Sequence, residues 1–232
     1  GKVLADGHFK TTDYPDVKDF VKALGANVKK LLAGKKDLEL VGIGIGAPDA
    51  NYHRGTIEHA PNLLWKGIVP LGDLVKKELN IKVAITNDAN AAAMGEMVFG
   101  GAKGMKDFIV LTLGTGLGSG IVVDGKLVYG HTGFAGEVGH LCVVPGGREC
   151  GCGRKGCLET YASATGLVKT VSLMISEMRA DSPLRDIPPS KLTSKAIADA
   201  AAKGDPIAVK AMEYTAEKLG LGIINSIVYT SP

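Results

Sequence analysis

The sequence lacks the segments that direct a chain into a membrane or out of the cell. None of its apolar runs approaches the ~20 residues that span a bilayer, and its first residues do not have the pattern of a secretory signal. It also lacks a dense block of Lys and Arg, because 27 basic and 24 acidic residues spread along the chain leave a net charge of only +3. We therefore expect no membrane and no nucleic acid among its partners.

Cysteine is also scarce, with four in 232 residues, three of them within eight positions. This usage does not indicate a secreted disulfide scaffold and favours a reducing, cytoplasmic location. An initiator methionine is absent too. The chain begins in a segment that resembles part of a hairpin around Asp6-Gly7, and it ends at Ser231-Pro232, directly after a predicted long helix. We expect both ends to be cut.

The composition is otherwise that of a globular protein, with 45% hydrophobic and 22% charged residues and 32 glycines. Strands and helices alternate in the first half of the chain. The second half has a hairpin, a cysteine-rich loop and three helices. The pattern predicts two α/β lobes, residues 1–106 and 107–232, with a cleft between them.

Apolar spacing and end signals place the individual elements. Helices are expected at 15–34, 71–80, 89–99, 158–178, 193–204 and 205–229, and strands at 38–48, 82–88, 107–113 and 120–129. Asp124-Gly125 is expected to form a hairpin turn inside the last of these segments. Gly220 and Gly222 in the final helix indicate close helix packing.

Three cysteines in a glycine-rich loop, Cys150, Cys152 and Cys157, predict a metal site. Glycines at 151, 153 and 156 let the backbone turn tightly enough for several sulfurs to face one point. Thiolates combined with an imidazole suit tetrahedral zinc, and four protein ligands make a closed, structural site.

The fourth ligand is left open by spacing alone. We favour His140 in the polar part of the loop. The alternatives are His131 and Cys142, and Cys142 lies in an apolar run, 141–144, that is typical of a buried strand. A disulfide is the alternative for the cluster itself, although Cys150 and Cys152 are too close in sequence to bridge comfortably.

Asn87-Asp88 follows a predicted buried strand and begins an alanine-rich helix. Either residue can be a simple helix N-cap. Alternatively, Asp88 is a functional carboxylate at the carboxyl end of a strand, where α/β sheets bind their ligands. Spacing alone does not decide between the two.

Glycines alternate at 114, 116, 118 and 120, directly after a predicted strand. Neither the dinucleotide fingerprint nor a P-loop fits, because another strand follows at once and Leu127 stands where a P-loop needs Ser or Thr. What remains is a tight turn with Thr115 at its tip, whose backbone N–H groups can bind a phosphate. The alternative is a plain hairpin.

Four segments together resemble the ROK family of sugar kinases, and most closely its bacterial glucokinases. They are TNDANAAAMGE, LTLGTGLGSGIVVDG, GFAGEVGH and CGCGRKGCLETYAS. The resemblance covers nearly the whole chain. It implies an actin-like, ribonuclease-H-like fold of two lobes with a sugar in the cleft, and a role in carbohydrate metabolism and glycolysis.

The resemblance also implies the site residues and cofactors. Asp88 would be the catalytic base, and Asn87, Glu137, His140 and Glu159 would hold sugar hydroxyls, with glucose favoured as the sugar. Gly114, Thr115 and Gly116 would face the phosphates of ATP, which acts with Mg²⁺, while zinc on His140 and the three cysteines is structural. Gly46 and Asn62 are further expected contacts with the sugar, and a homo-oligomer, most simply a dimer, is expected.

The sequence departs from the family pattern at both ends, because the Asp-x-Gly-Gly-Thr phosphate hairpin and the final glycine-rich segment are absent from the 232 residues. Three alternatives to a glucokinase therefore stay open. They are a kinase for an N-acetylhexosamine or fructose, a sugar-responsive transcriptional regulator of the same family, and a zinc-stabilised sugar-binding module.

Overall fold

The structure is a computed structural model that describes residues 2–35 and 37–232. It is of the expected α/β class and divides into two compact units. Unit 1 comprises Gly1–Met105 and Lys126–Ala135, and unit 2 comprises Lys106–Gly125 and Gly136–Pro232. The predicted lobes, 1–106 and 107–232, differ from these units because residues 126–135 belong to unit 1. The spacing of a hairpin in the sequence does not reveal this return.

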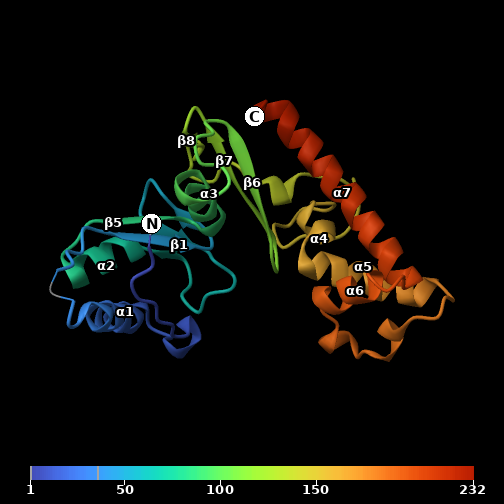
Figure 1. Ribbon diagram of the computed structural model, residues 1–232, viewed down its shortest axis with the longest axis horizontal. Helices are drawn as coiled ribbons and strands as arrows, with labels where there is room; N and C mark the ends of the chain where they lie inside the picture. The colour runs from blue at the N-terminus through green and yellow to red at the C-terminus, as the bar shows by residue number, and fades with distance from the viewer. Residues whose placement is uncertain (1, 36) are drawn as a thin grey trace. The chain divides into compact units, whose positions relative to one another are not determined.

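Unit 1 is built on two parallel strands, β1 (Ile43–Ala47) and β5 (Val83–Asn87). Helices α1 (Val17–Leu32) and α2 (Leu71–Leu79) pack together on one side of them (Figure 1). Helix α3 (Asp88–Phe99) starts directly at the end of β5 and packs against both strands. A short 3₁₀ helix, η1 (Thr11–Asp13), precedes α1.

Sequence signals account for these elements. The Asp16 side chain caps α1 by accepting the Lys18 N–H at 2.7 Å. Asn80 ends α2 with a positive φ of 49°, a conformation that asparagine tolerates better than most residues. The core of unit 1 gathers apolar side chains from both helices, both strands and the loop between them, including Phe20, Val21, Ile45, Trp65, Val75 and Ile85.

Unit 1 also contains a small antiparallel sheet of β2 (Ala50–Asn51), β3 (Thr56–Glu58) and β4 (Ile68–Val69). Residues 126–135 also belong to unit 1, and they begin with β8 (Lys126–Leu127), a strand of a different sheet. The fully buried Asn51 donates from Nδ2 to the Thr132 carbonyl at 2.8 Å, and the Tyr52 and Tyr129 rings stack 4.2 Å apart. These long-range contacts keep the returning segment in unit 1.

Unit 2 begins with an antiparallel hairpin of β6 (Phe108–Leu113) and β7 (Leu117–Val123), in register from Phe108↔Val122 to Leu113↔Leu117. The glycine-rich turn therefore links two strands, as predicted. Asp124 and Gly125 both have positive φ, 48° and 70°, which is the backbone of a tight two-residue turn.

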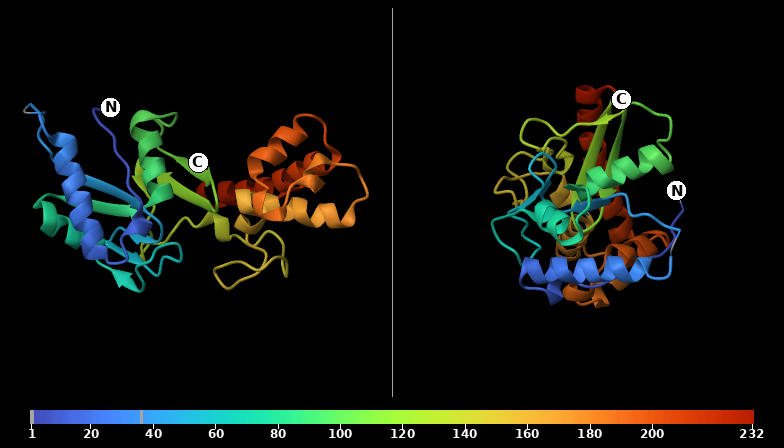
Figure 2. Two further views of the ribbon diagram at one scale, coloured as in Figure 1. Left: turned by 90° about the horizontal axis from the view of Figure 1, so that it is seen from below. Right: turned by 90° about the vertical axis from the view of Figure 1, so that its left-hand side faces the viewer.

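Four helices form the rest of unit 2: α4 (Glu159–Ala162), α5 (Ala164–Glu177), α6 (Ser194–Ala201) and α7 (Pro206–Thr230). Short 3₁₀ turns accompany them at η2 (Val138–His140), η3 (Pro183–Asp186) and η4 (Pro189–Lys191). Figure 2 shows α5, α6 and the start of α7 gathered in one group. Their core includes Leu167, Val171, Leu184, Ile197 and Ile207.

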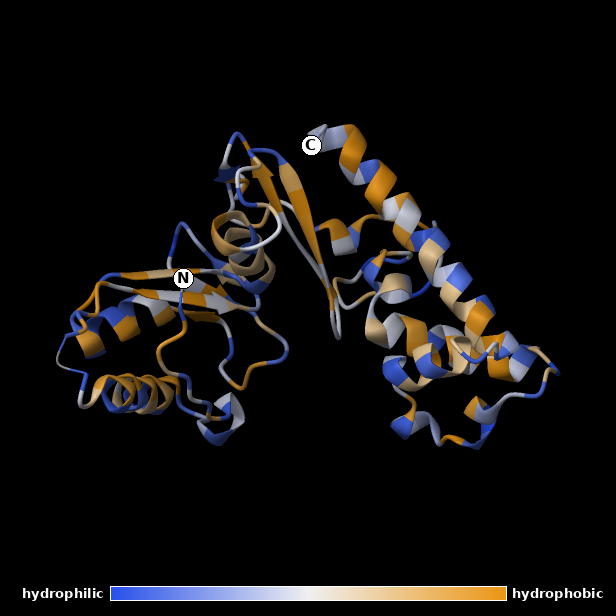
Figure 3. Cartoon of the chain, viewed as in Figure 1, coloured by the Kyte–Doolittle hydropathy of each residue, from blue (hydrophilic) through white to orange (hydrophobic). Residues whose placement is uncertain are grey.

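Helix α7 carries apolar residues to its end, and its last turns are coloured mainly as hydrophobic in Figure 3. Several of these side chains are exposed: Leu221, Ile224, Ile227, Val228 and Tyr229. Among the described residues, no helix combines the length and the apolar character needed to cross a membrane.

Three local predictions were wrong. Residues 2–10 form no strand, so the hairpin at Asp6-Gly7 is absent, and an isolated two-stranded hairpin is at best marginally stable. Cys142 lies in no strand, because its segment makes only one isolated bridge, to Cys157. The predicted helix 158–178 is broken at Ser163, whose extended backbone (φ −82°, ψ 168°) and side chain cap α5 at the Gly166 N–H.

The two glycines of α7 differ, which gives a first testable prediction. A Cβ at Gly222 would collide with the fully buried Leu158, whereas one at Gly220 would meet nothing within 4 Å. We expect Gly222→Ala to lower the free energy of unfolding by about 1–3 kcal/mol through overpacking. Gly220→Ala should raise it by about 0.5–1 kcal/mol, because alanine loses less backbone entropy in a helix. Urea denaturation of both variants tests this, and equal effects would contradict the packing at Leu158.

Candidate metal centre and substrate site

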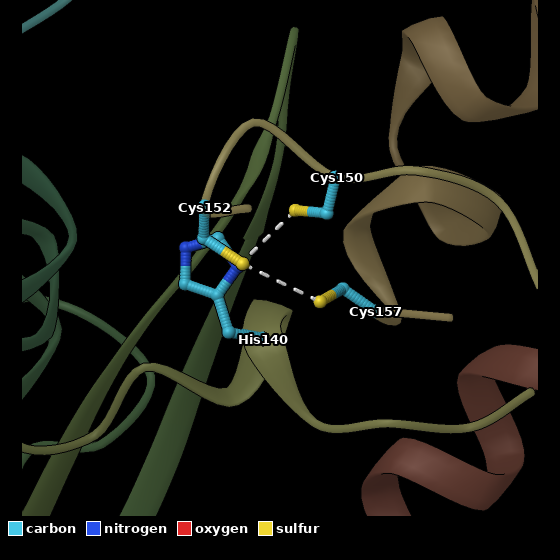
Figure 4. A group of neighbouring side chains, drawn as sticks. All are labelled: His140, Cys150, Cys152 and Cys157. Atoms are coloured by element: carbon cyan, nitrogen blue, oxygen red, sulfur yellow. Dashed lines mark hydrogen bonds between the residues drawn. The ribbon is translucent and has the colours of Figure 1, made fainter. Parts of the chain in front are cut away.

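The structure brings the four favoured metal ligands together in unit 2 (Figure 4). The ligand atoms of His140, Cys150, Cys152 and Cys157 all lie within 4.8 Å of one another. The Cys152 and Cys157 sulfurs are 3.7 Å apart, and the Cys150 sulfur is 3.6 Å from His140 Nδ1. Two zinc–sulfur bonds of about 2.3 Å at the tetrahedral angle place their sulfurs about 3.8 Å apart. The donor set and its spacing therefore fit zinc.

The metal loop, residues 148–157, is shaped by tight turns. The Cys150 N–H donates to the Arg154 carbonyl at 2.9 Å, and the Gly153 N–H donates back to the Cys150 carbonyl at 3.0 Å. Gly153 and Gly156 have φ values of 84° and 80°, which side-chain-bearing residues rarely adopt. At Gly156 a Cβ would also collide with the Val144 carbonyl. Glycine is thus required at both positions for the thiols to converge.

The thiols differ in their acidity. The pKa of Cys152 is lowered to about 6, first by the hydrogen bond from the Arg154 backbone N–H and then by the Arg154 side chain. Burial is the main cause that raises the pKa of Cys157, to about 12. The thiolate is the form that binds metal, and the lowered pKa of exposed Cys152 favours its thiolate.

The other candidate ligands lie outside this group. Cys142 is exposed, and its sulfur faces the Lys155 carbonyl at 3.7 Å. His131 belongs to unit 1, whereas the three cysteines belong to unit 2. All four cysteines are free thiols, so the disulfide interpretation finds no support in the structure.

Glu137 and His140 flank one turn of 3₁₀ helix, η2, which begins after Glu137 and ends at His140. One short turn of unit 2 therefore carries both residues, Glu137 as its N-cap and His140 as its last residue. Buried Ser119 on β7 anchors the turn, because its hydroxyl donates to the Gly136 carbonyl and accepts the Val138 N–H. These two hydrogen bonds hold the backbone of the turn that carries His140.

The glycine turn of residues 114–116 is held by two other elements of unit 2. Its Gly114 carbonyl accepts the Ala164 N–H at 2.9 Å, and its Thr115 carbonyl accepts the Thr165 hydroxyl at 2.7 Å, both at the start of α5. The half-buried Glu159 reaches back to the same turn, since its Oε2 accepts the Leu117 N–H at 2.9 Å. The Glu159 carboxylate therefore connects the glycine turn to α4, the helix that follows the metal loop.

Asn87 and Asp88 occupy the junction of β5 and α3 in unit 1. Both are cap residues, because the side chain of each accepts the Ala89 N–H at 2.8 Å. The capping role does not remove a functional one, since Asp88 is exposed and a carboxylate keeps a second oxygen. Gly46 lies on the neighbouring strand, where a Cβ would approach the Cβ of Ala91 to 2.9 Å. Exposed Asn62 lies in the same unit.

The structure thus gathers the predicted residues into two sets. Unit 2 holds the metal ligands, Glu137, Glu159 and the glycine turn, and unit 1 holds Asn87, Asp88, Gly46 and Asn62. Sequence reasoning missed Ser119, which positions η2, and Arg154, which acidifies Cys152. Only the proximity of Arg154 to two cysteines could have suggested its effect. Ser119 acts across 19 residues, and nothing in its spacing signals the contact.

Comparisons with known proteins identify the family. The family model described as the ROK family matches residues 1–232, so the chain belongs to the ROK family. The glucokinase of Halalkalibacterium halodurans is 41% identical over 201 residues, which cover 84% of this chain and 61% of the relative. The xylose repressor of Caldicellulosiruptor bescii is 38% identical over 194 residues, covering 83% of this chain and 48% of the repressor. The chain thus spans about half to three fifths of these two relatives.

Solved structures show the same fold. A ROK family glucokinase from Streptomyces griseus, in complex with glucose and AMPPNP, matches with a TM-score of 0.76 and 36% identity, covering 94% of this chain and 70% of that one. A ROK family transcriptional regulator, homologous to E. coli MLC, matches with a TM-score of 0.81 and 30% identity, covering 94% and 55%. The fold is therefore the two-lobed, actin-like α/β fold of the ROK proteins.

Proposed function

We propose that the protein transfers the γ-phosphoryl group of ATP to a hexose, with glucose the favoured substrate and glucose 6-phosphate the product. The observation that carries the proposal is the link within unit 2 between a glycine turn suited to phosphates and a set of side chains suited to a sugar. Glu159 makes that link through the Leu117 N–H at 2.9 Å. The similarity to glucokinases, including one crystallised with glucose and an ATP analogue, supports the same activity.

The proposed chemistry assigns the proton to Asp88. The carboxylate accepts the proton of the attacking sugar hydroxyl while that oxygen forms a bond to the γ-phosphorus, and the bond from phosphorus to the β-phosphate oxygen breaks to release ADP. The exposed position of Asp88 at the start of α3 leaves it accessible to a substrate. Asn87, Glu137, His140 and Glu159 are proposed to hold the other hydroxyls in place.

The ATP phosphates are proposed to lie against Gly114, Thr115 and Gly116. The two hydrogen bonds from α5 hold this turn rigid, so its backbone dipoles need no rearrangement during the reaction. Mg²⁺ would accompany the nucleotide and neutralise charge on its phosphates. No residue of the chain is assigned to it.

Zinc is proposed to be structural, held by His140, Cys150, Cys152 and Cys157. With four protein ligands it has no open coordination position, so its task is to stabilise the metal loop and to orient His140. Because Nδ1 of His140 faces the thiols, the ring's other nitrogen is proposed to serve the sugar. We also propose that the protein is a cytoplasmic homodimer, which size-exclusion chromatography with light scattering would test.

A second candidate function is sugar-responsive transcriptional regulation. It is favoured by the similarity to the xylose repressor and by the fold match with a ROK regulator. A regulator needs the sugar-binding side chains but neither a catalytic base nor a phosphate turn. The presence of both Asp88 and Gly114-Thr115-Gly116 therefore favours the kinase.

The test is ADP production by the protein expressed from its complete gene, measured with glucose, N-acetylglucosamine, N-acetylmannosamine, mannose, fructose and xylose. We expect the highest kcat/KM with glucose. If ADP is produced with another hexose and not with glucose, that hexose is the substrate. Calorimetric sugar binding without any ADP production would support the regulator instead.

A glycine in the phosphate turn provides a specific prediction. A Cβ at Gly116 would collide with Oε2 of Glu159, so Gly116→Ala is expected to push this carboxylate away from the Leu117 N–H. A hydrogen bond to a charged group contributes about 1.5–3 kcal/mol, so the KM for glucose should rise roughly 10- to 100-fold. Steady-state kinetics measure this, with Gly220→Ala as the control because that position has room for a Cβ. An unchanged KM would show that Glu159 does not hold the sugar.

A further inference from the structure

Arg148 makes an unusual set of contacts just before the first cysteine of the metal loop. Its Nη1 donates to the carbonyls of Thr160 at 2.8 Å and Gly166 at 3.2 Å, and its Nη2 donates to the Thr170 hydroxyl at 2.9 Å. Its guanidinium carbon also lies 4.5 Å from the centre of the Tyr161 ring. One side chain thus contacts α4 and the first two turns of α5.

The surroundings of this cation are neutral. Burial lowers the pKa of the half-buried Arg148, although an arginine remains charged. None of the ion pairs among the described residues includes it. Its charge is instead balanced by carbonyl dipoles, one hydroxyl and an aromatic face. Such an arrangement depends on the planar, forked geometry of guanidinium more than on its charge.

The backbone of Arg148 is fixed as well. Its N–H donates to the Tyr161 hydroxyl at 2.8 Å, and its carbonyl accepts the Gly156 N–H at 2.8 Å. The preceding Gly147 is required here, because a Cβ at that position would collide with the Tyr161 hydroxyl. Arg148 therefore ties both ends of the metal loop to the helices behind it.

The α4–α5 corner needs such support. Helix α4 is only four residues long, and one helical turn is not stable by itself. The chain then breaks at Ser163, and Arg148 binds a carbonyl on each side of that break. One of these two anchors is Thr160. Glu159, the first residue of α4, is its neighbour, and the metal ligand Cys157 lies three residues before Thr160.

We propose that Arg148 is a positioning residue that holds the metal loop against the α4–α5 corner, and thereby sets both the geometry of the zinc ligands and the position of Glu159. The effect on zinc follows from the contacts around the loop. The effect on sugar binding rests on the function proposed above. Lysine cannot replace this arginine, because a single ammonium group cannot reach three acceptors and stack on Tyr161 together.

The experiment compares Arg148→Lys and Arg148→Ala with Arg185→Lys. Arg185 is a matched control, because it also binds three backbone carbonyls in unit 2, those of Ile175, Met178 and Ala180. None of the hydrogen bonds and ion pairs of the described residues joins it to the metal loop. Two quantities are measured on each protein: the rate of zinc release to a chromogenic chelator, and kcat and KM for glucose. Melting temperatures are recorded alongside.

For both Arg148 variants we expect zinc release to be roughly 10-fold faster and the KM for glucose to be roughly 10-fold higher, as for other groups that orient metal ligands. The kcat at saturating glucose and ATP should change much less, because the proposed base, Asp88, belongs to unit 1 and keeps its own contacts. Arg185→Lys should lower the melting temperature without changing either quantity. Tyr161→Phe removes only the acceptor of the Arg148 N–H. It should raise both the rate of zinc release and the KM for glucose, by a smaller factor than the Arg148 variants do.

Zinc release at the wild-type rate in Arg148→Lys would overturn the proposal. Equal effects of the Arg185 and Arg148 variants would also overturn it, because the cause would then be general destabilisation. If the wild-type protein proves not to phosphorylate glucose, the function proposed above fails, while the zinc-release comparison still decides the role of Arg148.

Discussion

Replacing Asp88 with asparagine is expected to lower kcat for glucose by about 10²- to 10⁴-fold, the usual contribution of a general base. The dissociation constant for glucose should change by less than about threefold, because an amide still hydrogen-bonds a hydroxyl. The substitution also keeps the start of α3 intact, since asparagine retains the Oδ1 that accepts the Ala89 N–H. The loss is therefore specific to proton transfer.

A matched control is available in the same unit. Asp73 is another exposed aspartate in the first turn of a helix, α2, so Asp73→Asn makes the same change of charge near the start of a helix. We expect its kcat to equal that of the wild type. Stopped-flow kinetics and calorimetry on both variants provide the comparison. Near-normal turnover in Asp88→Asn would exclude Asp88 as the base.

Replacing Cys152 with serine is expected to remove zinc from the protein. Cys152 is the exposed ligand whose pKa is lowered to about 6, and a serine hydroxyl does not supply the thiolate that the site requires. An ion present at 1,000 times its dissociation constant adds about 4 kcal/mol of stability. Its loss should lower the melting temperature by roughly 10 °C. Glucose affinity should fall too, because His140 loses its anchor.

Cys142→Ser is the control for this experiment, because Cys142 is an exposed cysteine of the same segment that lies outside the ligand group. Elemental analysis should find one zinc per chain in the wild type and in Cys142→Ser, and close to none in Cys152→Ser. Retention of zinc by Cys152→Ser, or its loss from Cys142→Ser, would show that the ligand set is different.

Much of this organisation could be predicted from the sequence because the signals are local. The spacing of Cys150, Cys152 and Cys157 places three thiols in one turn-rich loop, and the structure adds His140 to them. Asn87-Asp88 was ambiguous between a cap and a functional pair, and both side chains do cap α3. A cap and a functional carboxylate have the same sequence signature, so only the site around them can separate the two.

Two features that could not be predicted, the helix break at Ser163 and the return of residues 126–135 to unit 1, depend on contacts between residues far apart in the sequence. The break at Ser163 lies inside an unbroken apolar pattern, and the groups that stabilise it include Arg148, which binds on both sides. The return of residues 126–135 to unit 1 depends on Asn51 and Tyr52, some 80 residues earlier. Periodicity describes which face of an element is apolar, but it contains no information about which distant partner that face meets.

The most direct test is to measure ADP and glucose 6-phosphate in the same reaction, using the protein expressed from its complete gene with ATP, Mg²⁺ and glucose. A dehydrogenase-coupled assay detects the sugar phosphate, and chromatography quantifies ADP. A sugar kinase produces the two in equal amounts, and only when glucose is present. Glucose binding with neither product, or ADP without glucose 6-phosphate, would contradict the proposed phosphoryl transfer.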